Sequence, residues 1–163
     1  MRKYDQQFRS IGHDHTDCVK SALQCAEYVC AEKGVRLTDL RRRVLELVWE
    51  SHRPVGAYYV LKALMKEMRA APPTVYRALD FLQEQGLVHR IASLNAYIGC
   101  ISPHTSHSGQ FLICGTCRES TEILNETVNN ALRKTAMNAG FAVQQQTVEI
   151  IGTCNRCRQS SKT

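Results

Sequence analysis

The sequence predicts an α+β chain with helices and a β-hairpin in its first part and a smaller α/β unit in its second part. Three observations carry this prediction. The hydrophobic period changes from helical to alternating after Gly86, residues 101–109 are polar with proline and glycine, and two Cys-x-x-Cys pairs follow. We therefore expect a polar tail at 1–15, one domain at 16–100, a linker at 101–109 and a second domain at 110–163.

The first domain is expected to begin with three helices. The first starts near Asp17 and ends at Gly34, and the second follows Thr38, a suitable N-cap residue. Pro54 and Gly56 then break the chain before the third. Apolar residues at helical spacing mark the inward faces of the second and third helices: Leu40, Val44, Leu45, Val48 and Trp49, then Val60, Leu61, Leu64, Met65 and Met68.

A fourth helix and a hairpin complete this domain. Pro72-Pro73 suits a first helical turn, and the helix is expected from about Thr74 to Gln85, with Gly86 as its end. Two strands, at 87–92 and 96–100, are joined by a short turn. Compact helices followed by a hairpin form a winged helix-turn-helix, in which the fourth helix is the candidate recognition helix.

The second domain is expected to contain strands at 110–114, 121–124 and 141–151 and a helix at 126–139. The apolar residues of that helix are predicted to face inward: Val128, Leu132, Ala136 and Met137. A unit of about 55 residues buries little core, so it needs a metal, a partner subunit or both.

Cys114-Gly-Thr-Cys117 and Cys154-Asn-Arg-Cys157 supply the four thiolates of a closed tetrahedral zinc site. Such a site has no open position for chemistry, so its role is structural. The alternatives are disulfides or a redox pair. The first ten residues are polar and show no secretory signal, so a reducing, cytoplasmic location is expected, and metal ligation is the favoured interpretation.

Charge and composition favour a nucleic-acid partner over a membrane. The net charge is +6, and residues 36–90 hold ten basic and six acidic side chains. A basic surplus in a helix-turn-helix region indicates DNA, although many basic clusters are only solvated surfaces. No apolar run reaches the roughly 18 residues that a membrane span needs.

The candidate DNA-binding residues are Thr74, Tyr76 and Arg77 on the fourth helix and Tyr58 at the start of the third. An arginine near the N-terminus of a recognition helix can donate two hydrogen bonds to guanine in the major groove. Threonine and tyrosine hydroxyls can bind phosphates. For any one of these residues, an ordinary solvated helix surface is the competing interpretation.

A second set of ligand-type residues flanks the linker: His89, Cys100, His107 and Glu122. One sulfur, two imidazoles and one carboxylate suit tetrahedral zinc better than magnesium, manganese or iron. Each residue also has an ordinary interpretation, as a surface histidine, a small buried thiol or a solvated carboxylate. His104 competes with His107, and His13, His15 and Cys18 are read as a tail entering a helix.

The chain resembles the ferric uptake regulator family, and within it the zinc uptake regulators. The matching stretches are Arg36-Leu37-Thr38 with Arg41, the run from Pro72 to Leu82, the run from Glu84 to His89, and both cysteine pairs. The resemblance implies a homodimeric repressor that takes zinc as corepressor, two zinc ions per subunit. It also implies that the cysteine pairs hold the structural ion and that His89, Cys100, His107 and Glu122 form the sensory site.

From these observations we expect a zinc-sensing repressor that binds operator DNA and uses no small organic substrate. Zinc importers as the regulated genes are an implication of the resemblance. Two departures from the family pattern are Leu40, where glutamine is usual, and a short linker before His107. The alternatives are a peroxide-, redox- or iron-responsive repressor of the same family. An enzyme would need an open zinc position, which four protein ligands do not leave.

Overall fold

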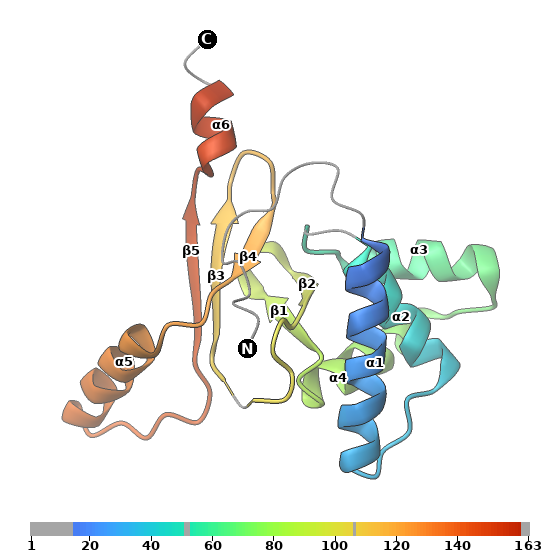
Figure 1. Ribbon diagram of the computed structural model, residues 1–163, viewed down its shortest axis with the longest axis horizontal. Helices are drawn as coiled ribbons and strands as arrows, with labels where there is room; N and C mark the ends of the chain where they lie inside the picture. Colours follow the sequence, from blue (N-terminus) through green and yellow to red (C-terminus); the bar gives the residue numbers. More distant parts are fainter. Residues whose placement is uncertain (1–14, 51–52, 106, 161–163) are drawn as a thin grey trace. The chain divides into compact units, whose positions relative to one another are not determined.

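The computed structural model describes residues 15–50, 53–105 and 107–160 (Figure 1). The chain divides into two compact units, and the division falls directly after Thr105. Each unit is described separately below. In the described part of the chain, no helix is both long enough and apolar enough to cross a membrane.

The N-terminal unit contains four helices: α1 (Thr16–Glu32), α2 (Asp39–Trp49), α3 (Ala57–Glu67) and α4 (Pro72–Glu84). Thr38 caps α2, since its side chain accepts a hydrogen bond from Arg41 N at 3.4 Å. Pro72 and Pro73 lie in the first turn of α4, so this helix starts two residues before the position expected from the sequence. The helices share one apolar core, whose fully buried members include Val44, Leu64, Leu79 and Leu82.

Helix α3 buries less of its apolar surface than its sequence predicts. Val60 and Leu64 are fully buried, whereas Met65 and Met68 are 62% and 39% exposed. The prediction that both methionines face inward is therefore wrong. A short helix that contacts its neighbours along one narrow stripe buries residues four apart and leaves the flanking positions at the surface.

The wing of this unit is an antiparallel hairpin of β1 (Val88–Ile91) and β2 (Ala96–Gly99). A short 3-10 turn, Ala92–Leu94, joins the strands, and Asn95 takes a left-handed conformation with φ of 46°. Val55 adds a single bridge to Tyr97. The hairpin places its residues in a fixed register, with Val88 opposite Gly99 and His89 opposite Ile98.

The C-terminal unit is built on a three-stranded sheet in the order β4-β3-β5. Strand β3 (Gly109–Cys114) pairs antiparallel with β4 (Ser120–Glu122) and parallel with β5 (Thr147–Gly152). The prediction of a strand from residue 141 is wrong in its start: Gly109 at the beginning of β3 pairs with Thr147, so residues 141–146 have no strand opposite them. A short helix, α6 (Asn155–Ser160), follows β5 and was not predicted.

Helix α5 (Glu126–Asn138) is held to the sheet by buried amides. The Gln110 side-chain amide donates to Asn129 Oδ1 at 2.9 Å, and the Gln146 amide donates to the same oxygen at 3.1 Å. The predicted inward positions of Leu132 and Met137 are wrong, since these side chains are 43% and 71% exposed. The physical reason is that Asn129 occupies the contact with β3, which turns the apolar residues of α5 outward.

Candidate metal centres and DNA-binding surface

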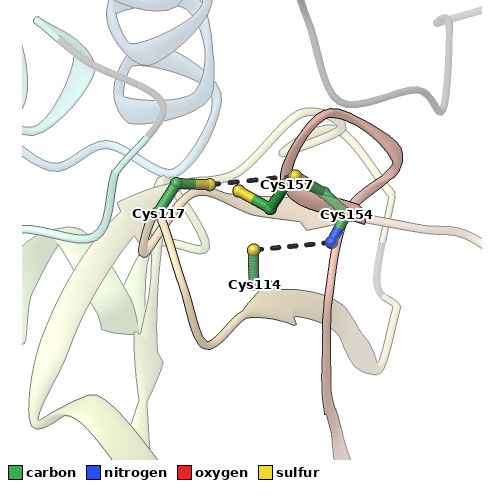
Figure 2. Close-up of side chains that lie close together, drawn as sticks. All are labelled: Cys114, Cys117, Cys154 and Cys157. Atoms are coloured by element: carbon green, nitrogen blue, oxygen red, sulfur yellow. Dashed lines mark hydrogen bonds between the residues drawn. The ribbon is translucent and has the colours of Figure 1, made fainter. Parts of the chain in front are cut away.

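The four predicted structural cysteines meet at one end of the C-terminal sheet (Figure 2). Cys114 is the last residue of β3 and lies opposite Gly152, the last residue of β5. Because these two strands are parallel, their carboxyl ends lie side by side, and the turns that follow carry the other cysteines to the same point. All four sulfur atoms lie within 4.8 Å of one another.

The geometry of these sulfurs fits zinc. The Cys117 and Cys154 sulfurs are 3.9 Å apart, close to the spacing that follows from four Zn–S bonds of about 2.3 Å in a tetrahedron. Cys154 N donates to the Cys114 sulfur at 3.4 Å, which is the usual support of a metal-bound thiolate. Arg156 and Glu119 form an ion pair at 2.8 Å that ties the second cysteine turn to the first.

The electrostatics of the cluster differ from one cysteine to the next. Burial raises the pKa of the Cys114 thiol, but N–H donors of Cys117, Cys154 and Thr116 outweigh burial and lower this pKa to about 6. Hydrogen bonding to the Cys154 sulfur raises the pKa of Cys157 to about 12. The N–H donors around Cys114 therefore favour its thiolate, the form in which cysteine binds a metal.

Two of the predicted sensory ligands lie in the N-terminal unit. His89 is in β1, and Cys100 directly follows β2, where its N–H donates to Leu87 O at 3.0 Å. In the hairpin register these residues are diagonal neighbours on one face. Their ligand atoms lie within 4.8 Å of each other, and Cys100 is 3% exposed. The hairpin thus presents one imidazole and one thiol together.

The other two predicted ligands lie in the C-terminal unit. Glu122 ends β4, and its carboxylate oxygen is 2.8 Å from His107 Nε2. The Glu122 side chain is 1% exposed and that of His107 is 9% exposed. A carboxylate is seldom buried to this degree unless a cation or hydrogen-bond donors balance its charge. The predicted four ligands are therefore two pairs, one in each unit.

His104 belongs to the N-terminal unit and has partners on α1. Its Nε2 lies 2.8 Å from the Cys25 sulfur, and its ring meets the Tyr28 ring edge-on at a centroid distance of 5.4 Å. His13 lies outside the described residues. His15 directly precedes α1 and Cys18 lies in its first turn. In the described part of the chain, neither belongs to a group of three or more metal-ligating side chains.

The predicted DNA-binding residues are at the surface of the N-terminal unit. On α4, Thr74, Tyr76 and Arg77 are exposed, while Val75, Ala78 and Leu79 between and after them are buried. Tyr58, at the start of α3, is 68% exposed, with Lys62 Nζ 5.0 Å from its ring centre. Helix α4 therefore has its apolar side in the core and its polar side outward, as a recognition helix requires.

A cleft of about 280 Å³ lies beside α4, and Tyr58 and Tyr76 line it together with Asp80, Arg90 and Asn95. Arg90 donates to Asn95 Oδ1 at 2.9 Å, which fixes the tip of the wing. Arg90 was not among the DNA-binding residues expected from the sequence. The available signal was strand alternation, because Arg90 follows His89 and must point to the opposite face of the hairpin.

Comparison with known proteins gives consistent matches. The model of the "Ferric uptake regulator family" matches residues 32–151. The zinc uptake regulation protein of Escherichia coli strain K12 is 40% identical over 137 residues, an alignment that covers 83% of this chain and 80% of that protein.

Solved structures agree with the sequence matches. A zinc uptake regulator complexed with zinc and DNA superposes with a TM-score of 0.84 at 37% identity, covering 89% of this chain and 98% of that one. The crystal structure of holo XcZur gives a TM-score of 0.80 at 41% identity, covering 85% and 98% of the two chains.

Proposed function

Since the chain belongs to the ferric uptake regulator family, we propose that it is a zinc-sensing transcriptional repressor that binds operator DNA as a zinc-loaded homodimer. Its function is regulatory, not enzymatic. The observation that carries the proposal is the similarity over nearly the full length of a zinc uptake regulator solved with zinc and DNA. The cytoplasm is its proposed location, and genes for zinc uptake are its proposed targets.

Two zinc ions per subunit are proposed, in different roles. Cys114, Cys117, Cys154 and Cys157 hold the structural ion. With four protein ligands this ion has no open position, so it contributes folding energy to a unit whose own core is small. The short sulfur separations and the N–H donors at Cys114 support this assignment.

The second, sensory ion is bound by His89 and Cys100 of the N-terminal unit and by His107 and Glu122 of the C-terminal unit. The buried His107–Glu122 pair of one unit and the His89–Cys100 pair of the other support this assignment. One zinc ion that needs ligands from both units stabilises the arrangement in which both ligand pairs can reach it. The thiolate of Cys100 favours zinc over iron at this position.

The recognition surface consists of Arg77, Tyr76 and Thr74 on α4, with Tyr58 beside them. Arg77 reads a guanine edge in the major groove, and the hydroxyl groups bind phosphates or a neighbouring base. This role is supported by the exposure of these side chains, since the opposite face of α4 is buried in the core. Two such helices in a dimer match two half-sites of an operator.

The C-terminal unit supplies the dimer contact. In the single chain its surface exposes several large apolar side chains: Leu124, Leu132, Met137, Phe141, Ile150 and Ile151. Exposed apolar patches of this kind mark association surfaces. A second subunit that covers them would bury the apolar residues that α5 turns outward.

The direct test is metal stoichiometry together with operator binding at buffered free zinc. We expect one ion per subunit that persists at low free zinc and a second that appears together with operator binding. A redox-responsive repressor, the rival function, would lose DNA binding on mild peroxide treatment at constant zinc content. Operator affinity that does not change with the free zinc concentration would contradict the proposal.

A further inference from the structure

The only tryptophan of the chain, Trp49, lies against a glycine next to a proposed sensory ligand. Trp49 is the last residue of α2, and Gly99 is the last residue of β2. A Cβ atom placed on Gly99 would lie 2.6 Å from Trp49 Cζ2 and closer still to two other ring atoms. The indole therefore occupies the space in which any larger residue at 99 would have its side chain.

The two faces of the wing hairpin have different surroundings. Gly99 pairs with Val88, and Val88 belongs to the core of the unit, as does Tyr97 two residues before Gly99. Successive residues of a strand point to opposite faces, so His89 and Cys100 lie on the face away from the indole. The hairpin is thus supported on one face by Trp49 and carries the ligands on the other.

Trp49 is itself firmly placed. The preceding residues of α2, Leu45, Leu47 and Val48, are at most 2% exposed, and the partly buried indole packs against the same core. The contact between α2 and β2 is therefore one between a rigid helix and a strand. A change in the space between Trp49 and Gly99 must be taken up largely by the strand, and Cys100 is the next residue along it.

We infer that Trp49 is a positioning residue for zinc sensing: by packing on Gly99 it fixes the end of β2 and thereby the sulfur of Cys100. The inference rests on the proposed function, because it needs Cys100 as a ligand of the sensory ion. Helix α2 also packs against α4, so the helix that carries Trp49 contacts both the ligand-bearing hairpin and the candidate recognition helix. Ligand positions that shift without loss of the ligand typically cost about 10–100-fold in metal affinity.

The experiment enlarges the side chain at position 99 and reduces the one at position 49. Chelator competition then measures the zinc affinity of each full-length dimer. Gly99→Ala should weaken the sensory zinc about tenfold and leave the cysteine-bound zinc in place. Trp49→Leu removes the three ring atoms that crowd the new methyl group. The double variant Gly99→Ala/Trp49→Leu should therefore bind sensory zinc more tightly than Gly99→Ala. Gly56→Ala is the matched control, because nothing lies within 4 Å of its new Cβ atom.

Three outcomes decide the inference. Sensory affinity of Gly99→Ala within about twofold of wild type would overturn it, since the contact would then not position the ligand. A double variant no tighter than Gly99→Ala would also overturn it, because it would show no coupling of the two positions. If Gly99→Ala does not fold, Trp49→Leu alone decides: a weaker sensory zinc supports the inference, and an unchanged one overturns it.

The failure of this inference is distinguishable from failure of the proposed function. The wild-type protein must first bind a second zinc that Cys100→Ser removes, and its absence would defeat the proposed function itself. The single tryptophan adds a spectroscopic readout. Filling the sensory site of the wild-type dimer should shift its emission, and Cys100→Ser should abolish that shift. An emission that ignores the second zinc would count against the link from Cys100 to Trp49.

Discussion

At the scale of single residues, the ligand types were predictable from the sequence, while their local partners were not. Spacing left His104 and His107 as competitors for one role. In the structure His107 faces the buried Glu122 carboxylate, whereas His104 contacts Cys25 and Tyr28 of α1. The contact of Trp49 with Gly99 could not be predicted from the sequence either, because the two residues are 50 positions apart and no local pattern connects them.

Removing one sensory ligand should abolish the response and spare the fold. We expect Cys100→Ser to remain a folded dimer with only the cysteine-bound zinc, which no longer binds its operator when zinc is added. The loss in affinity should exceed the 10–100-fold typical of indirect perturbations, because a ligand itself is removed. His107→Ala should behave in the same way, and His104→Ala serves as the control that keeps its response. The checks are zinc content and operator binding; repression by Cys100→Ser at normal free zinc would contradict the sensory assignment.

Arg77→Ala should weaken specific operator binding by about 1–3 kcal/mol and relax discrimination at one base pair. The reason is the exposed position of Arg77 on the first turns of α4, above a buried apolar stripe. Binding to specific and random duplexes should be compared by titration at one salt concentration. An equal loss on both duplexes would make Arg77 a phosphate contact, and no loss would place it outside the interface.

At the scale of elements, the sequence predicted the order of helices and strands, apart from α6, better than their ends and faces. Helical periodicity, prolines and glycines located α1 to α4 to within a few residues. The start of β5 could not be predicted because strand pairing with β3, not local propensity, decides it. The inward face of α5 was also wrong, since the buried amide contact of Gln110 with Asn129 determines its orientation.

The cap of α2 gives a test at this scale. Thr38→Ala removes the oxygen that accepts from Arg41 N, and we expect a loss of about 1 kcal/mol in the free energy of unfolding. Thr38→Ser keeps the hydroxyl and is the matched control. Denaturant unfolding of the zinc-loaded protein measures the difference. A Thr38→Ala variant as stable as wild type would show that the 3.4 Å contact contributes nothing in solution.

At the scale of the whole molecule, the two proposed zinc ions have different roles in one chain. The proposed structural ion would join two turns at one end of a small sheet, where few apolar residues are buried. We expect Cys154→Ser to unfold or monomerise the C-terminal unit, because the ion supplies folding energy that this core lacks. Sedimentation and circular dichroism check this result. A Cys154→Ser variant that stayed a folded, zinc-loaded dimer would contradict the structural role.

If the proposed sensory ion drives operator binding, the two sites are coupled, and that coupling must be reciprocal. If filling the sensory site raises operator affinity by a given factor, operator DNA must raise zinc affinity at that site by the same factor, typically 5–150-fold or about 1–3 kcal/mol. We expect chelator titrations of the wild-type dimer to show tighter sensory zinc in the presence of operator duplex, with the cysteine-bound zinc unaffected. Arg77→Ala is the informative control, because it weakens the operator contact without removing a zinc ligand. More operator duplex should therefore be needed to produce the same increase in the zinc affinity of this variant. If the affinity of the second zinc were the same with and without operator, that ion could not drive DNA binding. The assignment of His89, Cys100, His107 and Glu122 as the sensor would then be wrong.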